Sequence, residues 1–194
     1  MSKATKNILM AGVGGQGVIL ASEIVSEAVM LAGFDVKKSE VHGMAQRGGS
    51  VTSHVRFGEK VYSPIIRDGE VDILFSFEQL ETLRFQSVLK DDPVILVNQQ
   101  KILPPSVLLG RDTYPENIAK LLKEKYPRFE LVNAQGLALQ AGNARAVNVA
   151  FVGALSRYLE VPESIWHAAI EAMLPPKLVE VNLKAFALGR EVQN

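Results

Sequence analysis

Two glycine-rich blocks near the start of the chain contain residue types that can bind an anion. The first block is Gly12-Val13-Gly14-Gly15-Gln16-Gly17, which fits the pattern G-x-G-x-x-G. Between a strand and a helix, this pattern lets backbone N–H groups and a helix N-terminus hold a phosphate. Glu40 lies near the position where a dinucleotide-binding fold places its ribose-binding acid. Small residues also allow a helix to pack closely on a sheet, so this block alone leaves phosphate binding and packing open.

The spacing of the first block also fits the opening of a P-loop, but the residues after it do not. Val18 and Ile19 stand where a P-loop needs Lys followed by Ser or Thr to contact the phosphates and Mg²⁺. The sequence therefore excludes a metal-dependent nucleotide hydrolase of the P-loop type.

The second block, Glu40 to Ser50, is polar, and two glycines follow its Arg47. A guanidinium offers a rigid fork of donors, and glycines let a ligand approach the backbone. From the residues alone, a surface loop with an exposed arginine is the alternative. The candidate contacts for an anionic ligand are Gln46, Arg47, Gly48 and Gly49, and His42 could donate to a substrate carbonyl.

Other polar residues suggest less chemistry. The chain has no cysteine, and His42, His54 and His167 lack the spacing of metal ligands, so no metal site is predicted. We expect Glu78 and Glu81 to form a solvated helix face rather than an acid/base pair. Asn148 lies in an apolar helix, where a buried amide needs partners, and a structural tie to a neighbouring loop is expected.

The elements that must position these residues follow from the hydrophobic pattern. The apolar run 7–11 and the helical periodicity from Val18 to Gly33 predict a strand, a glycine turn and a helix around the first block. The remaining predicted elements are strands over 34–41, 71–75, 93–97 and 129–133, a hairpin formed by 51–57 and 61–62, and helices over 77–89, 115–126, 144–159, 163–174 and 177–188. Residues 99–114 are expected to form a loop or a strand-loop excursion. Short strands that alternate with helices predict an α/β fold with a mostly parallel sheet, an inserted β-hairpin and a helical C-terminal segment.

Composition limits the classes of partner. The 194 residues include 21 acidic and 21 basic side chains, so the chain has no net charge. DNA wrapping and general membrane-surface binding need a basic excess, so we expect neither a nucleic acid nor a membrane partner. The longest uncharged run, 7–22, is shorter than the roughly 20 residues of a membrane span. We expect a single cytoplasmic domain over residues 1–194.

Three segments together resemble one enzyme family. In order, the first block, the second block and Asn148-Val149-Ala150-Phe151-Val152-Gly153-Ala154-Leu155 resemble the gamma-type subunit or domain of 2-oxoacid:ferredoxin oxidoreductases. The resemblance covers nearly the whole chain. Within the family, the stretch 36–58 is most similar to the small beta subunit of the indolepyruvate type.

This resemblance implies a Rossmann-like three-layer fold and the role of a subunit that is inactive alone. Enzymes of this family oxidatively decarboxylate a 2-oxoacid with coenzyme A, giving an acyl-CoA, CO₂ and reduced ferredoxin. Thiamine diphosphate, Mg²⁺ and iron–sulfur clusters are expected in a large partner subunit, through which ferredoxin is reached. This chain is expected to bind no cofactor alone and to supply no catalytic residue.

For the two glycine-rich blocks, the resemblance implies different roles. The first block is expected to be a packing and interface element, whereas Gln46-Arg47-Gly48-Gly49 is expected to reach toward the substrate or coenzyme A. Two other functions remain open from sequence. A self-sufficient NAD(P)-dependent oxidoreductase would explain the first block and Glu40, although no Tyr-x-x-x-Lys proton donor is evident. A purely structural interaction subunit would need no ligand loop.

Overall fold

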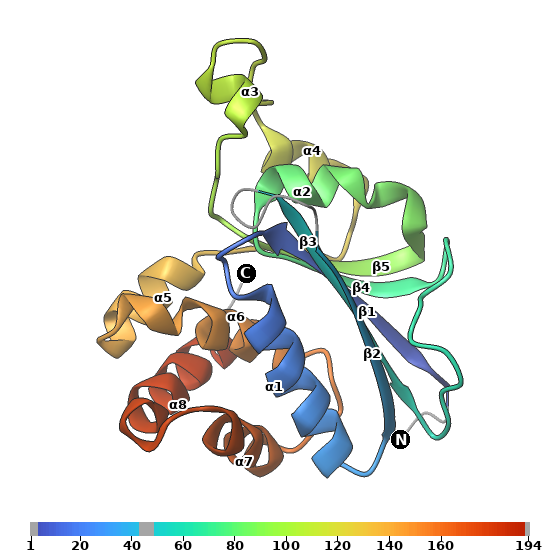
Figure 1. Cartoon of the computed structure of the whole chain (residues 1–194), viewed down its shortest axis with the longest axis vertical. Coiled ribbons are helices and arrows are strands. Elements are labelled where there is room, and N and C mark those ends of the chain that lie inside the picture. The colour runs from blue at the N-terminus through green and yellow to red at the C-terminus, as the bar shows by residue number, and fades with distance from the viewer. Residues whose placement is uncertain (1–3, 43–48, 193–194) are drawn as a thin grey trace.

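The apolar run near the N-terminus forms the central strand of a six-stranded sheet. This strand, β1 (Lys6–Val13), is buried from Asn7 to Val13. A strand that is apolar on both faces is typical of a sheet covered on both sides. The computed structural model describes residues 4–42 and 49–192, and it has helices on both sides of the sheet (Figure 1).

The strand order is β2-β3-β1-β4-β5-β6. The other strands are β2 (Asp35–His42), β3 (Ser50–Gly58), β4 (Val71–Ser76), β5 (Leu89–Asn98) and β6 (Phe129–Val132). β1, β4, β5 and β6 pair in parallel, whereas β3 lies antiparallel between β1 and β2. Five strands therefore run in one direction, and the predicted α/β fold with a mostly parallel sheet is confirmed.

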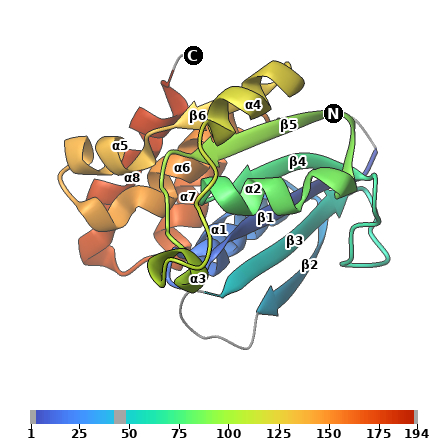
Figure 2. The same cartoon turned by 90° about the horizontal axis from the view of Figure 1, so that it is seen from above.

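Helices cover the two faces unequally, as the view from above also shows (Figure 2). The face that carries Ile8 and Met10 packs against the larger helical layer. This layer consists of α1 (Val18–Leu31), α5 (Ala134–Ala141), η2 (Ala144–Ala146), α6 (Val147–Ser156), α7 (Glu163–Met173) and α8 (Pro176–Arg190). The opposite face, with Leu9 and Ala11, packs against α2 (Gln79–Arg84) and α4 (Ile118–Lys125). Alternate residues of one strand thus supply two cores.

The remaining short helices are η1 (Gln86–Val88), which follows α2, and α3 (Pro105–Leu108), which lies beyond the end of β5. No helix within the described ranges is long and apolar enough to cross a membrane.

The β-hairpin differs from its predicted form. β3 pairs with β2, with His42 opposite Val51, and residues 61–62 lie outside any strand. The segment after β3 is instead held by side chains, because Asp35 accepts the Val61 N–H at 2.9 Å and Arg56 donates to the Ser63 carbonyl at 3.0 Å. The apparent second arm of the hairpin is therefore a loop that follows β3.

His54 of β3 is half-buried under this loop. Its Nδ1 accepts the Ile66 N–H at 3.2 Å, so the side chain ties β3 to the loop. Burial lowers the pKa of His54, and the nearby Arg56 charge lowers it further. The neutral imidazole is the form that can accept this bond.

Candidate functional site

A crevice forms where the connections from β1 and β4 leave the sheet toward opposite faces. β1 leads into α1 in one layer, and the neighbouring parallel strand β4 leads into α2 in the other. In open α/β sheets, ligands bind at this switch point, outside the carboxyl ends of the strands. The first glycine block lies at this edge.

The Gln16 side chain fills the crevice. Its Oε1 accepts the Val13 N–H at 2.7 Å, and its Nε2 donates to the Phe77 carbonyl at 2.8 Å and to Gln100 Oε1 at 3.0 Å. One amide therefore joins the turns that follow β1, β4 and β5. A dinucleotide that used this crevice would have to displace Gln16, and Glu40 is engaged by Lys38 at 2.8 Å. The dinucleotide-binding alternative gains no support from this geometry.

Glycine is required at position 17 for packing. Gly17 has φ of 77°, in the left-handed region, and a Cβ there would lie 1.9 Å from Nδ2 of Asn148. Asn148 comes from the first turn of α6, so this contact brings the first and third sequence segments together. Gly14 is also engaged, since its N–H donates to the Gly49 carbonyl at 2.9 Å.

Only the ends of the second block lie within the described residues. Gln46, Arg47 and Gly48 fall outside them, and for His42 the backbone alone is described, as the last residue of β2. Gly49 is bound to Gly14, and the next residue, Ser50, donates its hydroxyl to Oε2 of Glu81 at 2.6 Å. Both ends of the loop therefore lie at the carboxyl edge of the sheet, beside the glycine turn.

A polar pocket of about 450 Å³ opens between the glycine turn and the start of α6. The described residues around it include no acidic side chain. Four residues with side-chain amides and one with a guanidinium line it: Gln16, Gln100, Gln135, Asn148 and Arg145. Arg145 is exposed and forms no ion pair within the described ranges.

Backbone polarity adds to this positive character. The N-terminal end of α6 borders the pocket through Val147 and Asn148 and has no side-chain cap. An arrangement of amides, one cation and a helix N-terminus suits an anionic or strongly polar ligand.

Arg145 was not singled out from sequence. In sequence it stands in an unremarkable Asn-Ala-Arg-Ala stretch, and only the fold brings it opposite Gly14 and Gly15. The position of Arg145, three residues before Asn148, is the one sequence feature that could have identified it.

The expectation of a solvated face for Glu78 and Glu81 was wrong. Their relative exposures are 1% and 5%. Glu78 Oε2 accepts the Glu81 N–H at 3.0 Å as the N-cap of α2, and Oε1 accepts the Tyr114 hydroxyl at 2.7 Å and the Ile102 N–H at 3.1 Å. Burial, and then the bond to Glu78, raise the pKa of Tyr114. These acids are structural anchors, and residues distant in sequence supply several of their hydrogen bonds: Ser50, Ile102 and Tyr114.

The described part of this chain contains no group of three or more His, Cys, Asp or Glu side chains able to hold a metal ion. The absence of cysteine also removes the usual ligands of an iron–sulfur cluster.

Residues 7–192 match the family described as pyruvate ferredoxin/flavodoxin oxidoreductase. The chain belongs to this family. The pyruvate ferredoxin/flavodoxin oxidoreductase match includes both glycine blocks and α6, so the resemblance drawn from the three sequence segments is confirmed.

Relatives of similar length support a narrower placement within the pyruvate ferredoxin/flavodoxin oxidoreductase family. The chain is 41% identical over 188 residues to the indolepyruvate oxidoreductase subunit IorB of Pyrococcus horikoshii, covering 94% of this chain and 93% of the relative. It is 43% identical over 187 residues to the subunit of the same name from Archaeoglobus fulgidus, covering 94% and 92%. These relatives indicate a subunit of a heteromeric 2-oxoacid:ferredoxin oxidoreductase.

Solved structures of pyruvate ferredoxin/flavodoxin oxidoreductase relatives share the fold. The keto/oxoacid ferredoxin oxidoreductase gamma subunit from Geobacter sulfurreducens superposes with a TM-score of 0.73 at 26% identity, covering 97% of this chain and 95% of that one. The fold also recurs within the longer chain of a 2-oxoglutarate:ferredoxin oxidoreductase from Magnetococcus marinus, with a TM-score of 0.76 and 20% identity, where it covers 31% of that chain.

Proposed function

We propose that this chain is the small subunit of an indolepyruvate:ferredoxin oxidoreductase that accepts arylpyruvates. The assembled enzyme would oxidatively decarboxylate the 2-oxoacid with coenzyme A, giving an acyl-CoA and CO₂ and passing two electrons to ferredoxin. The observation that carries this proposal is the similarity to IorB subunits over 94% of the chain.

The proposal assigns the cofactors to subunits according to the metal ligands that this chain offers. Thiamine diphosphate, Mg²⁺ and the iron–sulfur clusters are assigned to a larger partner subunit, because the described residues offer no ligand set for them. Ferredoxin would therefore exchange electrons with the partner. Coenzyme A is a metabolite of the cell interior, so the proposal places the enzyme in the cytoplasm.

The role proposed for this chain is to hold the anionic part of coenzyme A at the carboxyl edge of the sheet. Arg47, Gly48 and Gly49 would supply charged and backbone donors from the second block, with Gln46 and His42 beside them. The pocket that contains Arg145 supports this role, because it combines an exposed guanidinium with amide donors and has no acid among its described residues. The bond from Gly14 to Gly49 ties one end of the loop to the glycine turn that borders this pocket.

Substitution of Arg47 tests the proposal. A charge-assisted hydrogen bond contributes about 1.5–3 kcal/mol, so Arg47→Ala should lower kcat/KM by roughly 10- to 150-fold if the contact persists in the transition state. Arg47→Lys should recover part of the loss, because an ammonium keeps the charge without the bidentate fork. Kinetics of the assembled complex, with coenzyme A and indolepyruvate varied in turn, provide the measurement.

Assembly is the control for this experiment, because a weakened subunit contact would also lower activity. Each variant complex should therefore be quantified by size-exclusion chromatography before it is assayed. If Arg47→Ala assembles normally and keeps wild-type kcat and KM for both substrates, the second block does not contact either of them.

A further inference from the structure

The segment 99–117, between β5 and α4, carries apolar side chains that the rest of the chain leaves exposed. We call this segment the excursion. Its short helix α3 has no buried residue, and α3 stands away from the other elements (Figure 1). Leu103, Leu108 and Leu109 have exposures of 44%, 68% and 67%. Single exposed leucines are ordinary on a protein surface, but three within one projecting segment form a patch that usually marks an interaction site.

The base of the excursion is firmly held, even though its leucines are exposed. The buried Glu78 carboxylate accepts the Ile102 N–H at 3.1 Å near one end and the Tyr114 hydroxyl at 2.7 Å near the other. Lys101 Nζ also lies 5.7 Å from the centroid of the Tyr114 ring. One carboxylate on α2 therefore closes the segment into a loop. This closure presents the leucines in a defined position and lowers the entropy lost on binding.

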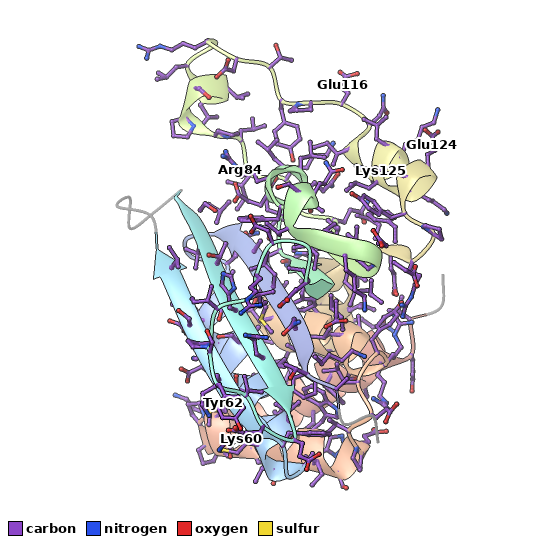
Figure 3. The ribbon with its side chains drawn as sticks, turned by 90° about the vertical axis from the view of Figure 1, so that its right-hand side faces the viewer. Lys60, Tyr62, Arg84, Glu116, Glu124 and Lys125 are labelled. Carbon is purple, nitrogen blue, oxygen red and sulfur yellow. The ribbon has the colours of Figure 1, made fainter. Side chains whose placement is uncertain are left out.

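An apolar groove of about 440 Å³ lies between the excursion and α2. Leu80, Leu103, Pro104 and Leu108 supply much of its wall. Figure 3 labels Arg84 of α2 below α3, and Arg84 pairs with Glu81 at 2.9 Å on the same side. The third charged group at the groove, Glu78, accepts the Tyr114 hydroxyl and two backbone N–H groups, so the leucines and prolines remain as the binding elements of the groove.

The groove is continuous with the candidate site. Val13 and Ser50 also border it, and these residues end β1 and begin β3 beside the glycine turn. A partner that occupied the groove would therefore also reach the carboxyl edge where the polar pocket opens.

We propose that the excursion and its groove dock the larger, cofactor-bearing subunit of the same enzyme, which inserts an apolar segment between α3 and α2. This inference rests on the proposed function. If this chain holds coenzyme A while the partner holds the acyl group, the partner must cover the carboxyl edge, and the excursion borders that edge. An obligate interface is rich in apolar contacts, which matches the exposed leucines.

A paired substitution on α3 tests the docking surface. Leu108→Glu with Leu109→Glu should weaken association with the larger subunit by about 30-fold or more, as expected when even one interface hot spot is lost. The matched control is Met30→Glu with Leu31→Glu at the end of α1, where the exposures are 53% and 44%. This control pair should bind as the wild type does, because it lies at the opposite edge of the sheet.

The measurement is co-purification of coexpressed subunits through a tag on the larger one, followed by titration of the purified chains. Circular dichroism should show both variants folded, because all four substituted side chains are exposed. Normal binding by the α3 variant would overturn the inference. So would a wild-type self-association that the α3 variant abolishes while binding to the larger subunit is kept, since the occupant would then be a second copy.

The same material separates this inference from the proposed function. If the α3 variant loses the larger subunit, but the wild-type complex oxidises no 2-oxoacid with coenzyme A, docking stands and the proposed function fails. If the wild-type complex is active and the α3 variant binds and turns over normally, the proposed function stands and docking at the excursion fails.

Discussion

At the scale of residues, the glycine turn packs against the turns and the helix that surround it. Gln16 joins three turns at the carboxyl edge, and Gly17 leaves room for Asn148. The G-x-G-x-x-G pattern is typical of phosphate binding. In this protein, the side-chain contacts of Gln16 and Asn148 also depend on it. Gly14, Gly15 and Gln16 of the turn also line the polar pocket.

Two glycines of this turn allow the free-energy cost of backbone strain to be measured separately from the cost of a steric clash. Gly15 and Gly17 both have positive φ, but a Cβ at Gly15 meets nothing within 4 Å, whereas one at Gly17 meets Asn148. Gly15→Ala should cost about 1–2 kcal/mol of unfolding free energy from backbone strain alone. Gly17→Ala should cost about 1 kcal/mol or more beyond that, because the Asn148 side chain must move.

Urea unfolding of the two variants provides the comparison, and Asn148→Ala completes a double-mutant cycle. In the Asn148→Ala background the additional cost of Gly17→Ala should disappear. An unchanged cost would show that the Asn148 side chain moves aside without a free-energy cost and does not stabilise the turn.

At the scale of elements, Glu78 connects α2 to the excursion. It caps α2 and accepts two further donors from residues that follow β5, so the position of the excursion depends on one buried carboxylate. This dependence makes Tyr114 a useful probe, because its hydroxyl can be removed without leaving a cavity.

Tyr114→Phe should lower the unfolding free energy by about 1.5–3 kcal/mol, the contribution of a hydrogen bond to a charged group. Burial and the bond to Glu78 raise the pKa of Tyr114 above its ordinary value of 10.0, so the wild-type stability should decline as pH rises past 10. The Phe variant should lose less stability over that range. Tyr62→Phe is the control, since Tyr62 is 89% exposed and lies on the 59–70 segment (Figure 3). Equal unfolding curves for Tyr114→Phe and the wild type would contradict the role of this contact.

At the scale of the whole molecule, the proposed function divides the reaction between this chain and a larger subunit. The sheet and its two helical layers form a frame for the polar carboxyl edge, and the described residues include no group of three or more His, Cys, Asp or Glu side chains able to hold a metal ion. The proposed function therefore assigns electron transfer from the 2-oxoacid to ferredoxin to groups of the larger subunit. The layer that carries α7 and α8 packs on the side of the sheet opposite α2, so the excursion and the largest helical layer lie on different faces.

The purified chain should therefore contain no stoichiometric iron and should not reduce ferredoxin with indolepyruvate and coenzyme A. Addition of the larger subunit should restore turnover. Metal analysis, visible absorbance and a ferredoxin-reduction assay of the separate and mixed subunits provide the test. Turnover by this chain alone would contradict both the division of labour and the assignment of the cofactors to a partner.

Several features of the fold could be predicted from local pattern. The strands predicted over 71–75, 93–97 and 129–133 correspond to β4, β5 and β6, since an apolar run of this length between turns has few other solutions. The helices predicted over 163–174 and 177–188 correspond to α7 and α8 within a few residues. In contrast, α5 was missed, because Gln135 and Gly136 interrupt its apolar pattern and Asn133 supplies the cap that starts it.

The sequence by itself determined the class of the fold, the glycine turn and the family, because each depends on residue types at short spacings. Only the tertiary structure decided which residues share the site. It paired β3 with β2, buried Glu78 and brought Arg145 and Asn148 against the glycine turn. Such contacts join residues that lie far apart in the chain, and their free energy depends on burial and partners that no local spacing encodes.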